Sequence, residues 1–256
     1  MLCSLLTGCF FLPGNFVSQL DVRRDGTFDF TYVGEIVTTL PEEGGARKWD
    51  PAMAHCYRED SDDERTCATD EIARQRTRFD ASENAREQQA ADIAELVGYD
   101  AYDEAANEEF ARKMENFKGW DKVAYKGHGV FAVEYRLSGT LEREMTFPVL
   151  PQAQMVMPFL TIRRAKDMVV EVEAPGLTPH RLREVMLRAL QGANGTSDRN
   201  DVPMFNRARG RFTLTSDTDL TASNGEESVS GDRHTVVWTI DGDTEIVPQA
   251  QIVLDR

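Results

Sequence analysis

The sequence predicts an α+β fold, mainly antiparallel β-sheet with an inserted acidic helical segment and one further amphipathic helix. Alternating apolar residues flank an Asp-Gly pair near the N-terminus, a pattern typical of a β-hairpin. Residues 50–118 are instead acidic, and their few apolar residues recur at helical spacing. Alternation returns from Lys122 onward, interrupted by one helical pattern that begins at Thr178. We therefore expect residues 15–256 to form a single α+β domain with a helical insertion at about 50–118.

Composition and charge limit the class of protein. The chain has 256 residues, 41% of them hydrophobic, which is enough for a sizeable core. With 29 basic and 44 acidic residues, its formal net charge of −15 argues against nucleic acid as a partner and against electrostatic attachment to anionic lipids. No apolar run of about 18 residues follows Cys9, so attachment to a membrane would depend on acyl chains.

The N-terminus contains a candidate lipidation site. A short apolar run ends in Leu5-Leu6-Thr7-Gly8-Cys9, which resembles the lipobox of bacterial lipoproteins. In that family the signal peptide is cleaved before the cysteine, and the thiol is joined to a diacylglycerol. The resemblance implies that residues 1–8 are a signal-peptide remnant, that Cys9 is lipidated, and that residues 9–14 form a lipidated tether on the periplasmic side of a bacterial membrane. No basic residue precedes the apolar run, as a signal peptide requires, which we explain by a start site further upstream.

Two cysteines remain for the folded domain, because Cys3 would leave with the signal peptide and Cys9 would be lipidated. In an oxidising compartment we expect Cys56 and Cys67 to form a disulfide. Such a bridge would contribute roughly 3 kcal/mol in the chain-entropy picture. A metal site is the alternative, but two thiols with only His55 adjacent match no common zinc pattern.

The N-terminal hairpin is the best-defined element of the sequence. A two-residue loop would place the apolar residues of its two strands on opposite faces. A three-residue loop, Arg24-Asp25-Gly26, pairs Val22 with Phe28 and directs both sets into one core. That loop needs a left-handed residue at its third position, where Gly26 stands. The core-facing residues are then Phe16, Ser18, Leu20, Val22, Phe28, Phe30, Tyr32 and Ile36.

The acidic insertion predicts three helices. Residues 50–118 include 19 acidic and 9 basic side chains, and their apolar stripes are narrow. The helices are expected to begin at Thr69, at Asp80, and at Asp100 or Asp103, where capping patterns occur. Narrow stripes suggest that these helices lie on the outside of a sheet. Their acidic surface fits either a basic partner or an ordinary solvated helix face.

The C-terminal half is expected to be mostly strands, near residues 130–135, 168–172, 211–215, 220–222, 235–240 and 252–254, with one helix that Thr178 caps and Gly192 ends. The stretch Met145–Ile162 is strongly apolar but contains three prolines, which disfavour a central strand. Burial in the core is one interpretation. The other is the rim of an apolar ligand groove, for which flexible methionines are suited; its candidate residues are Phe147, Leu150, Met155, Met157 and Phe159.

Motifs for catalysis or metal binding do not occur in the sequence. The four histidines form no pair at i+3 or i+4 spacing, and neither a nucleophile elbow nor a phosphate loop is present. The acidic run 59–64 lacks the alternate spacing and central glycine of an EF-hand loop, which makes calcium a minor alternative. We expect a non-enzymatic protein with no catalytic residues, no cofactor and no metal.

Three stretches add a resemblance of their own, namely FVSQLDVRRDGTFDFTYVG (16–34), MPFLTIRRAKDMVVEVEAPG (157–176), and GRFTLTSDTDLTASN with VVWTI (210–224 and 236–240). After a lipobox, they resemble envelope lipoproteins known from alphaproteobacteria, and the C-terminal pattern is similar to the LppM-like lipoprotein family. The turn at 216–219 lacks the glycine of that family's pattern, and residues 50–118 look like an insertion that LppM-like domains lack. The resemblance implies an extracytoplasmic, non-enzymatic α+β domain, with lipid or glycolipid binding suggested for some members.

Two functions fit these expectations. The first is a lipid-anchored cell-envelope module that binds a lipid, a glycolipid or another envelope protein. The second is a structural or assembly protein that docks through its acidic helical face without a small ligand. An enclosed apolar pocket lined by residues 145–162 would favour the first function, and a filled core with an exposed acidic surface would favour the second.

Overall fold

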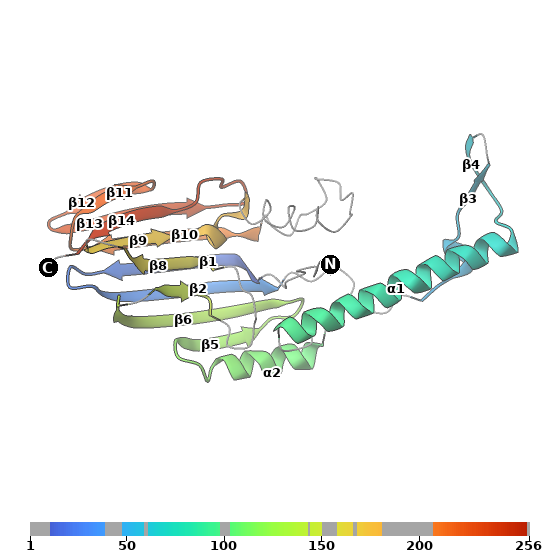
Figure 1. Cartoon of the computed structure of the whole chain (residues 1–256), viewed down its shortest axis with the longest axis horizontal. Helices are drawn as coiled ribbons and strands as arrows, with labels where there is room; N and C mark the ends of the chain where they lie inside the picture. Colours follow the sequence, from blue (N-terminus) through green and yellow to red (C-terminus); the bar gives the residue numbers. More distant parts are fainter. Residues whose placement is uncertain are drawn as a thin grey trace, which may run out of the picture.

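The structure is a computed structural model and describes residues 11–38, 48–58, 61–97, 103–142, 144–149, 158–165, 168–180 and 207–254. Two β-sheets face each other, and a long helix leads away from one end of them (Figure 1). Most strand pairs are antiparallel, and the described elements include two α-helices. The predicted α+β class is therefore confirmed.

The larger sheet has seven strands in the order β12-β13-β10-β1-β2-β6-β5. Neighbouring strands are antiparallel except β1 and β10, which are parallel. The strands are β1 (Phe11–Val22), β2 (Thr27–Thr38), β5 (Trp120–Tyr125), β6 (Val130–Thr140), β10 (Arg209–Ser216), β12 (Glu226–Ser230) and β13 (Arg233–Ile240).

The smaller sheet has five strands in the order β11-β14-β9-β8-β7, all antiparallel to their neighbours. They are β7 (Met145–Phe147), β8 (Leu160–Arg164), β9 (Val169–Glu173), β11 (Leu220–Ser223) and β14 (Gln249–Val253). A single helical turn, η3 (Pro175–Leu177), follows β9 and contacts β1. The apolar stretch with three prolines thus forms part of this sheet, with the short strand β7 at its edge.

The β1–β2 hairpin has the predicted register. Val22 pairs with Phe28 and Leu20 with Phe30, and these side chains are buried. Gly26 has a positive φ of 81°, and its N–H donates to the carbonyl of Arg23 at 2.8 Å. The loop therefore has three residues with the left-handed position at the third, as expected.

The core lies between the two sheets and is rich in aromatic rings. Phe147 on β7 is fully buried. Its ring centroid lies between 4.6 and 6.0 Å from those of five other rings, which belong to Phe30, Tyr32, Trp120, Tyr135 and Phe159. Such contacts add to the stabilisation from apolar burial.

Helix α2 (Glu104–Met114) covers apolar side chains near β5 and β6. It begins where one capping signal predicted, because the Asp103 carboxylate accepts from the N–H groups of Ala105 and Ala106 at 2.8 and 3.3 Å. Its buried Met114 and half-buried Phe110 contact the core. The expectation that helices lie on a sheet holds for α2.

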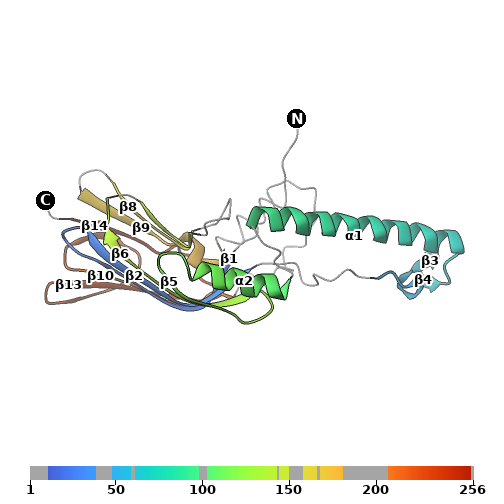
Figure 2. The ribbon, with the colours of Figure 1, turned by 90° about the horizontal axis from the view of Figure 1, so that it is seen from below.

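Helix α1 (Thr69–Val97) corrects the prediction of two helices in this region. It runs without a break for 29 residues, roughly 43 Å at 1.5 Å per residue. The capping pattern at Asp80 is overridden, because no Gly or Pro interrupts the chain there and Asp80 pairs with Arg76 at 3.7 Å within the helix. Two views show α1 leading away from the sheets rather than covering one (Figures 1 and 2).

Two expectations about the ends of elements also change. The predicted tether over residues 9–14 is wrong from Phe11 onward, because residues 11–14 begin β1 and are buried. Pro13 is tolerated there since β10 pairs with β1 only from Asn15, so that among the described strands Pro13 is paired with β2 alone. The helix expected from Thr178 to Gly192 lies outside the described residues beyond residue 180. Neither described helix is long and apolar enough to cross a membrane.

Candidate functional site

The candidate site is the arm, which we define as residues 48–58 and 61–97. It consists of the helical turn η1 (Pro51–Met53), the hairpin of β3 (Cys56–Arg58) and β4 (Ser61–Arg65), and α1. Cys56 and Cys67 form a disulfide with Cα atoms 5.3 Å apart, so the predicted bridge is confirmed. It joins β3 to the segment that leads into α1.

Side chains of α1 hold the hairpin in place. Gln75 donates to the carbonyl of His55 at 2.9 Å and accepts from the N–H of the same residue at 3.2 Å. Its amide also approaches the Cys56 sulfur at 3.5 Å. The rings of Trp49 and Phe79 pack at a tilt, with centroids 5.4 Å apart. The first turns of α1 and the hairpin therefore form one small unit.

The start of α1 is closed by a charged network. The Glu71 carboxylate accepts two hydrogen bonds from Arg65, at 2.8 and 2.7 Å, and one from the Ala68 N–H at 2.8 Å. The Arg65 hydrogen bonds, followed by the Ala68 N–H, lower the pKa of Glu71 to about 2. Since Ala68 immediately precedes the helix, Glu71 supplies the return half of a capping box.

The exposed surface of the arm differs from the expected flat acidic face. Asp70 and Asp80 pair with arginines one helical turn away, at 2.6 and 3.7 Å. The acidic excess is denser in the hairpin, whose sequence from 56 to 65 has five acidic and two basic side chains, than in α1, whose 29 residues include seven acidic and four basic ones. Tyr57 and Met53, at this far end of the arm, are 52% and 46% exposed. The tip thus combines two exposed apolar side chains with negative charge.

The hairpin offers one geometric candidate for a metal site. Atoms of Cys56, Cys67 and Glu71 lie within 4.8 Å of one another. The two sulfurs are bonded to each other, however, and metal binding by cysteine requires the thiolate. We therefore interpret the cluster as a disulfide next to the carboxylate that caps α1, and not as a metal site.

The groove candidates do not come together as a ligand site in the described residues. Phe147 and Phe159 are 0% and 1% exposed and their rings contact each other at 5.8 Å, so both belong to the filled core. Their prediction as groove residues is wrong. Although prolines interrupt this apolar stretch, its side chains are buried between the two sheets. The other candidates, Leu150, Met155 and Met157, lie outside the described residues. The apolar gap beside α2, between Phe11 and Pro148, has a volume of about 10 Å³, at most room for one water.

Sequence analysis missed a shallow polar depression of about 290 Å³ on the outer face of the smaller sheet. Arg163 pairs there with Glu171 at 2.6 Å, and Gln249 donates to Glu173 at 3.0 Å. In the sequence this depression corresponds to the polar residues that alternate with apolar ones in each strand. Any solvent-exposed sheet face has the same pattern, so the pattern does not identify the depression. These side chains satisfy one another across neighbouring strands.

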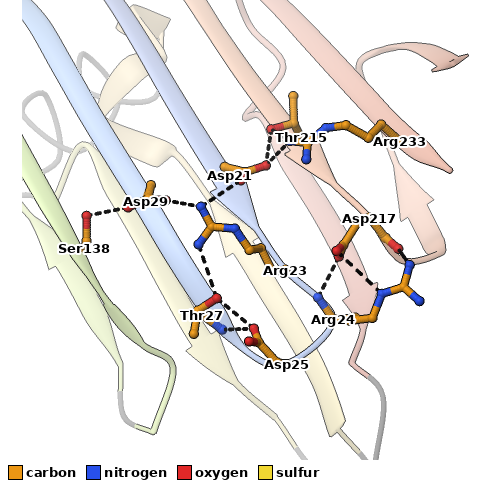
Figure 3. Close-up of polar contacts among 10 residues, drawn as sticks. All are labelled: Asp21, Arg23, Arg24, Asp25, Thr27, Asp29, Ser138, Thr215, Asp217 and Arg233. Atoms are coloured by element: carbon orange, nitrogen blue, oxygen red, sulfur yellow. Dashed lines mark hydrogen bonds and ion pairs between the residues drawn. The ribbon is translucent and has the colours of Figure 1, made fainter. Parts of the chain in front are cut away.

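A second polar cluster crosses five strands of the larger sheet, from β6 to β13, near the β1–β2 turn (Figure 3). The register places Asp21 directly opposite Asp29, which would be unfavourable for two like charges alone. Arg23 lies between them and pairs with both, while Arg233 pairs with Asp21 and Ser138 donates to Asp29. The Ser138 hydrogen bond, followed by that of Arg23, lowers the pKa of Asp29. This cluster stabilises strand register.

The predicted lipidation site, Cys9, lies outside the described residues. Two residues after it, Phe11 begins β1 and is 2% exposed.

Comparison with solved structures gives a distant likeness. No protein-family model matches the chain, and no curated protein matches it. A solved structure to which the chain is similar is the NMR structure of the folded domain of the Mycobacterium tuberculosis LppM protein. The alignment covers 100% of this chain and 97% of that one, with 14% identity and a TM-score of 0.32. A score this low supports no conclusion about function, and an alphaproteobacterial origin has no support from these comparisons.

Proposed function

We propose that this protein is a lipid-anchored, non-enzymatic component of the bacterial cell envelope that docks onto a partner protein through its arm. The observation on which the proposal rests is the arm itself, a helix of 29 residues that leads away from the sheets and ends in a disulfide-bonded hairpin. Of the two functions the sequence allowed, the burial of Phe147 and Phe159 in the core favours docking without a small ligand.

The energetics of the arm support a role in binding rather than in stabilising the sheets. The sequence of α1 is largely polar, so the helix gains little from tertiary burial and depends in part on pairs such as Arg74 with Asp70. An isolated two-stranded hairpin is marginal in water, yet the Cys56–Cys67 bridge holds this one preformed. A preformed tip lowers the entropy lost on binding.

The chemistry of the tip favours a protein partner. Tyr57 is half exposed, and tyrosine is among the residues that contribute most to protein interfaces. The acidic residues of the hairpin would steer a partner with a basic surface. A non-enzymatic role fits the described polar clusters, whose members pair with one another at strand and helix surfaces.

Site-specific photo-crosslinking in intact cells tests the docking function. A benzophenone amino acid in place of Tyr57 should give one discrete adduct, and the adduct should vanish when Cys56 and Cys67 are both changed to serine. The same probe in place of Val229, which is 62% exposed on the larger sheet, is the matched control. Equal adducts at both positions, or none at Tyr57, would contradict the proposal.

The anchor is tested separately. Metabolic labelling with an alkyne fatty acid should mark the wild-type protein and leave Cys9→Ala unlabelled. Equal labelling of the two proteins would rule out Cys9 as the acylated residue.

A further inference from the structure

We infer that the larger sheet receives the arm tip of a second copy of this protein on its outer face. The inference rests on the proposed docking function of the arm and names its partner. It follows from two surfaces of the molecule, the hairpin face that carries Tyr57 and the sheet face around Val17. Each surface combines exposed apolar side chains with a charge, and the two charges are of opposite sign.

The outer face of the larger sheet has an exposed apolar centre. By outer face we mean the side turned away from the smaller sheet (Figure 2). Val17 of β1 and Val33 of β2 are directly paired, and they point to this side because the alternate residues Phe16 and Tyr32 are buried in the core. The two valines are 51% and 52% exposed. The solvated face of an antiparallel sheet is normally polar, and adjacent exposed apolar side chains, unlike scattered single ones, indicate an interaction surface.

A cationic side chain lies beside these valines. Arg211 of β10 is paired with Val17, so its side chain shares the outer face one strand away. It is exposed, and among the described residues it makes no side-chain hydrogen bond or ion pair. The nearest carboxylate of the same row, Glu134 opposite Val33, already pairs with Lys122 at 3.3 Å. We define Val17, Val33 and Arg211 as the sheet patch, an apolar surface next to a guanidinium that can accept a new partner.

The arm tip carries the complementary pair of side chains. Tyr57 on β3 and Glu64 on β4 are directly opposite each other in the hairpin, so they share one of its faces. Tyr57 is 52% exposed. The Glu64 side chain stays 63% exposed although its carboxylate lies 2.7 Å from a ring nitrogen of His55. The tip therefore presents an aromatic ring next to a carboxylate with room for further hydrogen bonds.

The spacing within the two pairs matches. Tyr57 and Glu64 stand on neighbouring strands, as do Val17 and Arg211, and neighbouring strands lie about 4.7–4.9 Å apart. When the tyrosine ring covers the valines, the carboxylate is thereby placed within reach of the guanidinium. Aromatic rings pack well against β-branched side chains, and an arginine can donate two parallel hydrogen bonds to one carboxylate. The two surfaces are therefore complementary in both shape and charge.

The contact joins two molecules rather than two parts of one. Helix α1 has 29 residues, roughly 43 Å at 1.5 Å per residue, and both views place β3 and β4 at its end remote from the sheets (Figures 1 and 2). Because tip and patch are different surfaces, each contact leaves one free tip and one free patch, to which further copies can add. A net charge of −15 makes two copies repel each other elsewhere, which restricts association to the place where opposite charges meet.

A mixing experiment tests the contact between tip and patch. The full-length chain, with its disulfide intact and Cys9→Ser to prevent acylation, is studied by sedimentation velocity, and wild-type oligomers should grow with protein concentration. Tyr57→Ala and Arg211→Glu should each associate at least about tenfold more weakly, because an aromatic anchor is lost or like charges meet. An equimolar mixture of these two variants should give a dimer and nothing larger, since the patch of the first binds the tip of the second. Lys126→Glu is the matched control, because it changes the charge equally at an exposed residue outside the patch, and it should associate like wild type.

Exchange of the two charges keeps misfolding apart from lost binding. Arg211→Glu combined with Glu64→Arg in one chain should restore the oligomers, because the ion pair is re-formed with its signs reversed. A wild-type chain that stays monomeric, a mixture that gives no dimer, or a charge exchange that restores nothing would overturn the inference.

Photo-crosslinking at Tyr57 in cells separates this inference from the proposed docking function. An adduct that contains only this chain, at twice its mass, supports a second copy as the partner. An adduct with a different protein contradicts the second copy and leaves the docking function standing. The lack of any adduct contradicts both.

Discussion

Truncation of Phe147 decides between a core and a groove for the proline-rich apolar stretch. Its side chain is 0% exposed and contacts five aromatic rings. Removal of a buried phenylalanine ring costs about 3–5 kcal/mol, through lost transfer energy and the cavity left behind. For a domain of this size that loss lowers the melting temperature by roughly 10 °C. As a rim residue of an open groove, Phe147 would contribute far less.

Val149→Ala is the matched control. Val149 is two residues along the same chain but 56% exposed, so its truncation should change stability by no more than about 0.5 kcal/mol. Both variants are prepared with Cys9→Ser to prevent acylation and are unfolded with urea. Near-UV circular dichroism follows the aromatic cluster directly. If Phe147→Ala unfolds at the same urea concentration as Val149→Ala, the assignment of this stretch to the core is wrong.

Three further perturbations test the hairpin, the disulfide and the polar cluster. Gly26→Val should lower the free energy of unfolding in urea melts by at least about 1–2 kcal/mol, because φ is 81° and a Cβ would meet a core side chain at 3.3 Å. The control is Gly127→Val, which should cost less because its φ is 87° but nothing lies within 4 Å of its Cβ. The reverse order of stability would refute the packing described at the β1–β2 turn. Reduction of the Cys56–Cys67 disulfide should destabilise the arm by roughly 3 kcal/mol and increase amide hydrogen exchange in the arm alone. Faster exchange in the sheets as well would show that their stability depends on that of the arm. The pKa of Asp29 is held below 3.8, so the stabilising effect of its carboxylate is present above that pH and is lost as the pH falls through the lower folded-state pKa. Asp29→Asn should therefore be less stable than wild type near neutral pH and equally stable in acid. A difference in stability that does not change with pH would refute this role of the Asp29 carboxylate.

Local patterns predicted local structure well. The parity of apolar residues around Gly26 fixed the hairpin loop, because a shift by one residue would have moved every side chain to the opposite face. The Asp103 cap and the Cys56–Cys67 bridge were also accessible from sequence. In each case the signal and the structure involve residues close together in the chain.

Long-range structure left no such signal. The parallel pairing of β1 with β10 joins Phe16 to Gly210. The alternation of apolar residues in either strand does not identify the strand with which it pairs. Strand β12 was missed because all its residues, Glu226–Ser230, are exposed, so an edge strand of this kind has no buried set to alternate. The single helix α1 was divided in two, since a capping pattern at Asp80 can equally stand inside a helix.

The position of β1 within the larger sheet has a mechanical consequence. Over residues 16–22 it pairs with β2 on one side and β10 on the other, so it is an interior strand that begins at the anchored end. If a partner pulls on the arm while Cys9 stays in the bilayer, tension enters the hairpin at Phe11 of β1 and at Thr38 of β2, which are paired at the same end. The hydrogen bonds between β1 and β2 would then open one after another from that end rather than shear together. Load on the arm would therefore separate two interior strands of the sheet, starting beside the anchor.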